Sequence, residues 1–212
     1  TPSRSTLLNI QKAAAAVLHP FALWLREQVI ASGLLGTDDT RVTLLLPNDI
    51  PEACADDPKS QRIHEVFTAA RAEGRTSVSG RMWAYRSLTI PINVFDFTVS
   101  RHRDGPDDVL IGGNFVGTII ADCYSGYQGI TLRSDERILR AACNAHARRK
   151  IFEAKDNYPM ESCQLLAIYQ QLYDVNDRAA RMPVAERARL HGSESRPLWA
   201  PIREGLDSEP AP

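Results

Sequence analysis

The sequence lacks the long apolar runs that mark membrane proteins and secretory leaders. No stretch of its 212 residues approaches the roughly 20 consecutive apolar residues that a membrane-spanning helix needs. The most apolar early run, residues 13–25, is interrupted by His19 and Pro20 and has no signal-peptide architecture. These absences predict a soluble, cytoplasmic protein without a membrane partner.

Paired cysteines are absent as well. The four cysteines, Cys54, Cys123, Cys143 and Cys163, lie far apart and form no Cys-x-x-Cys pair. Their spacing argues against a disulfide framework and against a zinc ribbon. Cys143 and His146 have the spacing of half a zinc site, but a structural zinc ion needs four ligands and the other half has no obvious source.

The sequence also has no excess of positive charge. Its 25 Lys and Arg residues are balanced by 26 Asp and Glu residues, which gives a formal net charge of −1. Neutralisation of phosphates dominates affinity for nucleic acids, so DNA-binding domains usually carry a surplus of Lys and Arg. Any basic surface must therefore be local, unless the main DNA-gripping domain lies outside this chain. The first residue is Thr1 rather than Met, which fits a fragment of a longer protein.

The hydrophobic pattern predicts a mixed α/β layer fold followed by helices. Helices are predicted over residues 5–19, 21–32, 61–72, 144–155 and 161–181 and from residue 183 onward, and strands over 40–46, 82–87, 90–100, 115–121 and 138–143. Pro20 is expected to separate the first two helices, because proline breaks the hydrogen-bond ladder of a helix. Residues 101–108 are predicted to form a polar turn, and the tail after Asp207 is predicted to be frayed.

Two aspartates stand out by their location in this pattern. Asp38 is expected immediately before the first buried strand, and Asp122 at the carboxyl end of the fourth strand. Carboxylates at strand ends can converge at one edge of a sheet, where they bind Mg²⁺ because hard cations prefer oxygen ligands. The alternative is that each aspartate simply caps a turn, a common role at strand ends.

The predicted helix from Asn144 carries three functional groups on one face. His146, Arg149 and Glu153 are spaced by three and by four residues, so a base, a cation and an acid lie together on one face of the helix. This set suits phosphodiester chemistry. The alternative is a solvated face with an ion pair between Arg149 and Glu153.

Two local basic clusters could contact phosphates. Arg148, Arg149 and Lys150 form the stronger cluster, and residues 101–103 form the second. Runs of charge are more often solvated surface, so both interpretations stay open. Tyr124 and Tyr127, which follow Asp122, either stack beside a DNA strand or pack in the core.

Six short segments, taken in order, are similar to the motifs of one known family. They are residues 2–7, Thr37-Asp38-Asp39-Thr40, Arg81-Met82-Trp83-Ala84-Tyr85, Phe95-Asp96-Phe97 with Ser100-Arg101, Asp122-x-Tyr124-x-Gly126-Tyr127, and the block from Cys143 to Ala154. The chain resembles the insertion sequence 66 family of bacterial transposases over about residues 2–199.

This resemblance implies a ribonuclease-H-like mixed sheet flanked by helices, with an α-helical C-terminal extension. It implies Mg²⁺- or Mn²⁺-dependent DNA cleavage and strand transfer at transposon ends, with two ions in the active complex. In that complex Asp38 would bridge both ions and Asp122 would hold one. Glu153 is the nearest candidate for the third acid, although the family's third acid is expected in a later Asn-Asn-x-x-Glu-Arg element that this sequence does not contain.

The resemblance also implies DNA partners and a division of the chain. Transposon ends and target DNA are the expected partners, bound by a homo-oligomer. Candidate DNA-binding residues are Arg101, His146, Arg148, Arg149 and Lys150. N-terminal helices are expected over residues 1–36, the catalytic core over 37–158 with an insertion at 48–79, and a helical extension with its tail over 159–212.

Three other functions remain open at this point. The chain could be a truncated, non-catalytic remnant that binds DNA or an intact transposase. It could be a nuclease-like hydrolase on the same fold, or a zinc-dependent binding module that uses Cys143 and His146.

Overall fold

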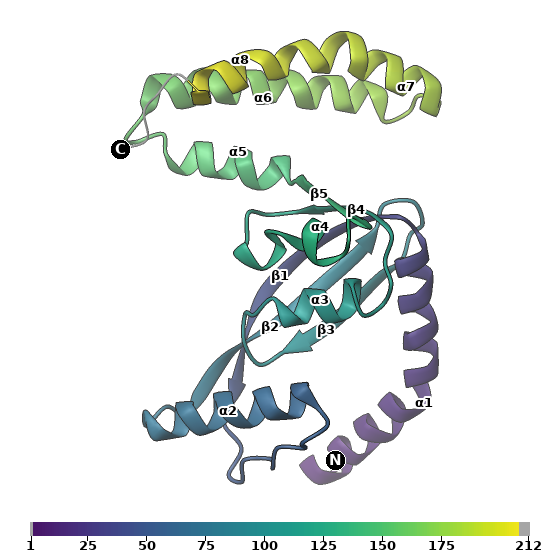
Figure 1. Cartoon of the computed structure of the whole chain (residues 1–212), viewed down its shortest axis with the longest axis vertical. Helices are drawn as coiled ribbons and strands as arrows, with labels where there is room; N and C mark the ends of the chain where they lie inside the picture. The colour runs from purple at the N-terminus through teal and green to yellow at the C-terminus, as the bar shows by residue number, and fades with distance from the viewer. Residues whose placement is uncertain (1, 208–212) are drawn as a thin grey trace. The chain divides into compact units, whose positions relative to one another are not determined.

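The chain divides between Cys143 and Asn144 into two compact units. Figure 1 shows the computed structural model, which describes residues 2–207. The first unit contains the β-sheet and the second is helical. The predicted frayed tail after Asp207 lies outside the described residues, and the predicted division at residues 36 and 158 stays a prediction.

A five-stranded mixed sheet forms the centre of the first unit. Its strands are β1 (Leu34–Leu45), β2 (Ser77–Ser87), β3 (Asn93–Thr98), β4 (Gly117–Ala121) and β5 (Ile138–Ala142). They lie in the order β3-β2-β1-β4-β5, with β1 antiparallel to β2, β2 antiparallel to β3, and both β1–β4 and β4–β5 parallel. This mixed α/β sheet has a ribonuclease-H-like arrangement, as predicted.

Helices of the first unit pack against the sheet. They are α1 (Arg4–Ala31), α2 (Pro58–Ala72), α3 (Asp104–Leu110) and the short α4 (Ile130–Arg133). In Figure 1, α3 lies in front of the sheet. The main core joins Val29 of α1 and Leu110 of α3 to the sheet residues Leu35, Trp83 and Ile119, all of which are fully buried.

A second, smaller core lies under α2. Phe67 and Ala70 of this helix pack with Val78 of β2 and with Val99, which follows β3. The predicted insertion at residues 48–79 therefore has its own apolar anchor on the first unit. Alternate residues of a strand point to opposite faces of a sheet, and Phe95 and Phe97 lie on the face of β3 away from the main core, where both are exposed.

The prediction that Pro20 separates two helices was wrong. Helix α1 runs without interruption from Arg4 to Ala31 and contains Pro20. Proline removes one backbone donor, but residues 13–16 of the same helix are alanines, the strongest helix former. The helix begins after Ser3, whose side chain accepts from the backbone N–H of Thr6 at 3.2 Å, and its first residue, Arg4, is one position before the predicted start.

The first strand begins six residues earlier than its sequence pattern predicted. β1 starts at Leu34, directly after Gly33, which has a φ of 72°. Residues 34–36 pair in parallel with β4, and Leu35 is fully buried in the core. Asp38 therefore lies inside a strand, and its predicted location before the strand was wrong. The predicted polar turn at residues 101–108 is also partly helical, because α3 begins at Asp104.

The second unit consists of helices, as predicted. They are α5 (Asn144–Glu153), α6 (Pro159–Ala179), α7 (Val184–Leu190), a π-helical turn η2 (His191–Ser195) and α8 (Arg196–Asp207). Tyr169 and Leu172 of α6 and Ile202 of α8 form its buried centre, against which Ala147 and Ile151 of α5 pack. Among residues 2–207, no helix is long and apolar enough to cross a membrane.

Gly117 is expected to be essential for the junction of β4 with the end of α1. Its φ is 145°, and a Cβ atom there would lie 2.0 Å from the carbonyl oxygen of Gly33. Gly117→Ala should therefore lower the free energy of unfolding by about 3 kcal/mol, because it combines backbone strain with a backbone clash. Gly36→Ala is the matched control, since its Cβ would meet only Leu88 at 3.8 Å. Urea unfolding of both variants by circular dichroism tests this, and equal stabilities would contradict it.

Candidate active site

The parallel pairing of β1 with β4 brings the two predicted aspartates to neighbouring strands. The last paired residues are Gly36 of β1 and Ile120 of β4. Asp38 and Asp122 each stand two residues further along their chains. Asp122 directly follows the last residue of β4, so its predicted location at the carboxyl end of this strand is confirmed.

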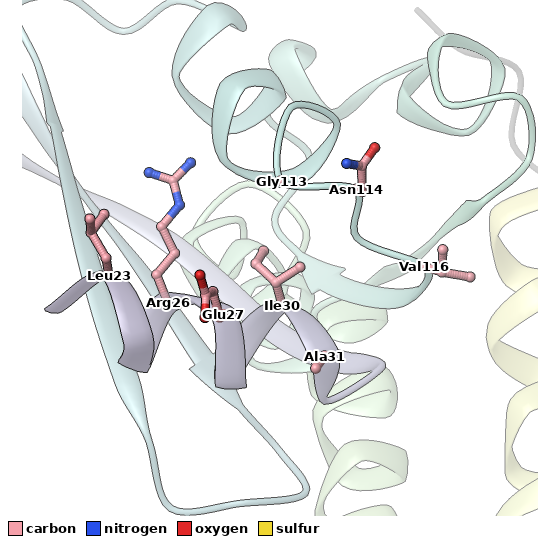
Figure 2. Close-up of a pocket in the computed structure, with 8 residues that line it drawn as sticks. All are labelled: Leu23, Arg26, Glu27, Ile30, Ala31, Gly113, Asn114 and Val116. Carbon is pink, nitrogen blue, oxygen red and sulfur yellow. The ribbon is translucent and has the colours of Figure 1, made fainter. Parts of the chain in front are cut away.

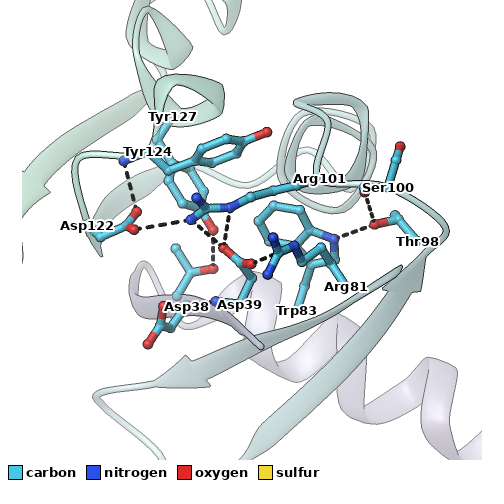
Figure 3. Close-up of polar contacts among 11 residues, drawn as sticks. Asp38, Asp39, Arg81, Trp83, Thr98, Ser100, Arg101, Asp122, Tyr124 and Tyr127 are labelled. Atoms are coloured by element: carbon cyan, nitrogen blue, oxygen red, sulfur yellow. Dashed lines mark hydrogen bonds and ion pairs between the residues drawn. The ribbon is translucent and has the colours of Figure 1, made fainter. Parts of the chain in front are cut away.

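Asp38 and its neighbour Asp39 point in opposite directions. Because successive side chains of a strand alternate between the faces of the sheet, only one of the two can face the core side. The Asp39 side chain is 2% exposed, whereas Asp38 is exposed. An Asp38 carboxylate oxygen accepts from the backbone N–H of Asp39 at 2.9 Å, and Figure 3 shows this carboxylate turned away from Asp122.

Four charged side chains form what we call the carboxylate–guanidinium cluster: Asp39, Arg81, Arg101 and Asp122 (Figure 3). Arg101 donates from Nε and Nη2 to Asp39 Oδ1 at 2.9 and 2.7 Å, and from Nη2 to Asp122 Oδ2 at 3.3 Å. Arg81 Nε lies 3.4 Å from Asp39 Oδ2 as an ion pair without hydrogen-bond geometry. Asp39 and Arg81 were not among the predicted site residues.

Arg101 is held from several sides. Its guanidinium carbon lies 4.1 Å from the centre of the Tyr124 ring, a cation–π contact. Burial lowers the pKa of Arg101, but the hydrogen bond to Asp39 and the charges of Asp39 and Asp122 outweigh burial and raise it. The guanidinium therefore stays charged and neutralises two carboxylates. It bridges β1 to the end of β4, and its predicted contact with DNA stays a prediction.

An aromatic layer lies beneath the cluster. Trp83, Tyr124 and Tyr127 contact one another, with ring centres 5.8 to 6.3 Å apart. Trp83 is fully buried, and its Nε1 donates to Thr98 Oγ1 at 2.8 Å. The hydroxyl of Tyr127 is hydrogen-bonded to Thr37 Oγ1 at 2.7 Å, and burial raises the pKa of Tyr127 well above its usual value. Tyr127 thus belongs to the core, and Tyr124 is the half-buried ring under Arg101.

The remaining predicted residues lie on α5, in the helical unit. The Glu153 carboxylate is exposed and accepts from Lys150 Nζ at 2.7 Å, a hydrogen bond that lowers the pKa of Glu153. Its hydrogen-bonded partner is thus Lys150 rather than the expected Arg149. Arg149 is exposed, and the Arg148 guanidinium lies 6.0 Å from the Tyr173 ring centre. His146 is half-buried.

The described residues contain no assembled metal centre. Within residues 2–207, no group of three or more His, Cys, Asp or Glu side chains is arranged to hold a metal ion. All four cysteines are free thiols. A separate open groove of about 560 Å³ lies between the last turns of α1 and the loop before β4 (Figure 2), and it is lined by none of the predicted site residues.

Comparison with known proteins decides the family. The profile of the Transposase IS66 family matches residues 1–210. This chain belongs to the Transposase IS66 family. It is also 26% identical over 175 residues to the uncharacterized protein y4hP of Sinorhizobium fredii, a match that covers 72% of this chain and 31% of y4hP. The chain thus spans about a third of that relative's length, and no solved structure matches it significantly.

In this IS66-family chain, segments far apart in the sequence meet at the carboxylate–guanidinium cluster. Asp39 comes from β1, Arg81 from β2, Arg101 from the loop after β3, and Asp122 from the end of β4. Sixty-two residues separate Asp39 from Arg101. Asp39 could have been found from the sequence, because it lies four residues after the apolar Leu35 and alternate residues of a strand share one face of the sheet. No local signal in the sequence pairs Arg81 or Arg101 with it.

Proposed function

We propose that this chain is the catalytic portion of an Asp-Asp-Glu type DNA transposase that cleaves transposon ends and transfers the strands to target DNA. The observation that carries the proposal is the parallel β1–β4 pair, which brings Asp38 and Asp122 to neighbouring positions on a ribonuclease-H-like sheet. Membership of the IS66 family supports it. We propose Glu153 as the third acid, and His146, Arg148, Arg149 and Lys150 as contacts to DNA.

The cofactor we propose is Mg²⁺ or Mn²⁺, held by Asp38 and Asp122. Carboxylate oxygens are the type of ligand that these hard cations prefer. Their arrangement in this conformation does not fit two ions, because Asp122 faces Arg101 and the Asp38 carboxylate is turned away from Asp122 (Figure 3). Bound ions would activate the attacking water or hydroxyl and stabilise the leaving oxygen.

The residues of the cluster suggest how the site could change on binding DNA. Arginine presents a planar fork of donors that matches both carboxylates and phosphates. A DNA phosphate could therefore take the Arg101 guanidinium away from Asp122, which is the weaker of its two contacts at 3.3 Å. Asp122 would then be free of its cation. Asp39 would keep Arg81 and continue to tie β1 to β2.

A strand-transfer assay tests the proposed function. The complete transposase, incubated with its transposon ends, a target plasmid and Mg²⁺, should yield products in which a transposon 3′ end is joined to target DNA. Cleaved but unjoined DNA would instead indicate a nuclease-like hydrolase. Neither cleavage nor joining by the complete protein would indicate a non-catalytic remnant.

Arg101→Ala is expected to increase the affinity of the chain for Mn²⁺ by about tenfold. A guanidinium within a few ångströms of Asp122 repels a divalent cation, and at an effective dielectric constant of about 20 this repulsion exceeds 1 kcal/mol. Electron paramagnetic resonance of free Mn²⁺ measures the affinity. Arg137→Ala is the control, because the Arg137 Nε donates to the Ser134 carbonyl rather than to a carboxylate of the cluster. Unchanged or weaker Mn²⁺ binding by a folded Arg101→Ala variant would contradict a competition between Arg101 and the metal.

A further inference from the structure

A second cavity lies in the first unit between the start of α2, the end of β3 and the start of α3. Its volume is about 270 Å³. Its walls are largely apolar and include Ile63 of α2, Phe97 and Val99 at the end of β3, and Gly105 of α3. We call this cavity the β3-end pocket.

Two glycines set the shape of the β3-end pocket. A Cβ atom at Gly105 would lie 2.9 Å from Trp83 Nε1, so the backbone of α3 packs directly against the Trp83 ring at this wall. A Cβ atom at Gly80 would lie 2.8 Å from Phe97 Cζ, which means that the Phe97 ring rests directly on the backbone of β2. The pocket therefore contains an aromatic ring, Phe97, that is held against β2, and such a ring can stack on a planar ligand.

The rim of the pocket is charged. Lys59 Nζ lies 2.8 Å from Asp108 Oδ2, and this hydrogen bond raises the pKa of Lys59, so the amine stays charged. His102 Nδ1 lies 2.6 Å from Asp104 Oδ2. The Nε of Arg62, a third lining residue, is buried and has no hydrogen-bond partner among the described residues. A buried donor without a partner is a position where an acceptor on a ligand gains a hydrogen bond.

The pocket and the carboxylate–guanidinium cluster share one loop. Ser100 and His102 line the pocket, while Arg101 between them reaches Asp39 and Asp122. Figure 3 shows Ser100 and Thr98 on the chain that leads into Arg101. A phosphodiester held at Arg101 would therefore have an adjacent nucleotide close to the pocket.

We propose that the β3-end pocket receives one unstacked base of a DNA strand, with that strand's phosphates on Lys59, Arg62 and Arg101. The inference rests on the proposed function, since it describes how the same site would bind its DNA. An apolar wall with one fixed ring supplies stacking, and cations at the rim supply the contacts to the backbone. An apolar side chain of a partner protein would use the walls but would leave the buried Arg62 Nε without an acceptor.

The test compares DNA with and without bases on the full chain. Fluorescence anisotropy measures binding of a labelled oligothymidine and of an abasic strand of the same length and charge. We expect the wild-type chain to bind oligothymidine about tenfold more tightly, because stacking of a base on an aromatic side chain contributes an effect of this order. Ile63→Trp, which fills the pocket, should remove this preference and leave abasic binding unchanged.

Two further variants keep the test decisive. Ile63→Phe fills the pocket with less disturbance if Ile63→Trp does not fold, and Leu132→Trp on α4 is an exposed control outside the pocket. Equal wild-type affinity for both strands, or a preference that survives in a folded filled-pocket variant, would overturn the inference and leave the transposase proposal intact. Absence of DNA binding by the wild-type chain and by the complete transposase would overturn both.

Discussion

Asp38→Asn and Asp122→Asn are each expected to reduce strand transfer by the complete transposase by roughly a thousandfold or more, because metal ligands contribute several kcal/mol to the transition state. Asparagine keeps the volume of each side chain but removes the negative charge that a divalent ion needs. Asp38 is exposed and Asp122 is partly exposed, so the thermal unfolding of both variants should stay close to that of the wild type. Gel analysis of joined products together with differential scanning fluorimetry measures the two effects.

Asp39→Asn is the matched control, and we expect it to lower the stability of the fold, which the other two substitutions should leave unchanged. Its side chain is 2% exposed and is held by Arg101 and Arg81, so the substitution leaves a buried site with excess positive charge. We expect a loss of about 2 kcal/mol in unfolding free energy, the order of a hydrogen bond to a charged group. Full activity of Asp38→Asn together with inactivity of a stably folded Asp39→Asn would move the catalytic role from Asp38 to Asp39.

Trp83→Ala is expected to lower the free energy of unfolding by about 3–5 kcal/mol, a large share of the roughly 5–15 kcal/mol that stabilises a typical domain. Trp83 is fully buried, contacts Tyr124 and Tyr127, and donates to Thr98. Its removal leaves a cavity beneath the carboxylate–guanidinium cluster and removes the hydrogen bond that Thr98 Oγ1 accepts, although this hydroxyl still donates to the Ser100 carbonyl. Strand transfer should fall as well, even at a temperature where the variant is folded, because Trp83 contacts Tyr124 and the Tyr124 ring supports Arg101.

Met82→Ala provides the comparison within the same strand. Met82 points to the other face of the sheet and is 36% exposed, so its truncation should cost less than about 1 kcal/mol. Chemical denaturation followed by circular dichroism measures the free energy of unfolding of both variants. A Trp83→Ala variant as stable as Met82→Ala would show that the aromatic layer does not hold the first unit together.

Local patterns in the sequence were sufficient for the elements that are strongly periodic. The run of β-branched residues before Asp122 predicted a strand that ends at this aspartate, and β4 does end there. Helix α6 lies within two residues of its predicted span, because its apolar residues recur at helical spacing. The aromatic and charged motifs, taken in order, were enough to suggest the family that the profile match confirms.

The start of β1 could not be predicted from the local sequence pattern. The glycines around residues 34–36 indicated the end of a helix. These residues form a strand because β4, more than 80 residues later in the sequence, pairs with them. Since the side-chain period of a strand is two, the pairing decides which of Asp38 and Asp39 faces the cluster. A similar limit applies to Arg101, which the sequence shows only as part of a basic run.

The sequence by itself determined the composition of the site: the two aspartates Asp38 and Asp122, a basic run after β3, and an aromatic pair after Asp122. Only the tertiary structure decided how these groups are used. It buries Asp39 under Arg101, turns the Asp38 carboxylate away, and places Tyr127 in the core. The physical reason is that a charge can be buried only when a partner of opposite charge arrives, and here those partners come from other strands and loops.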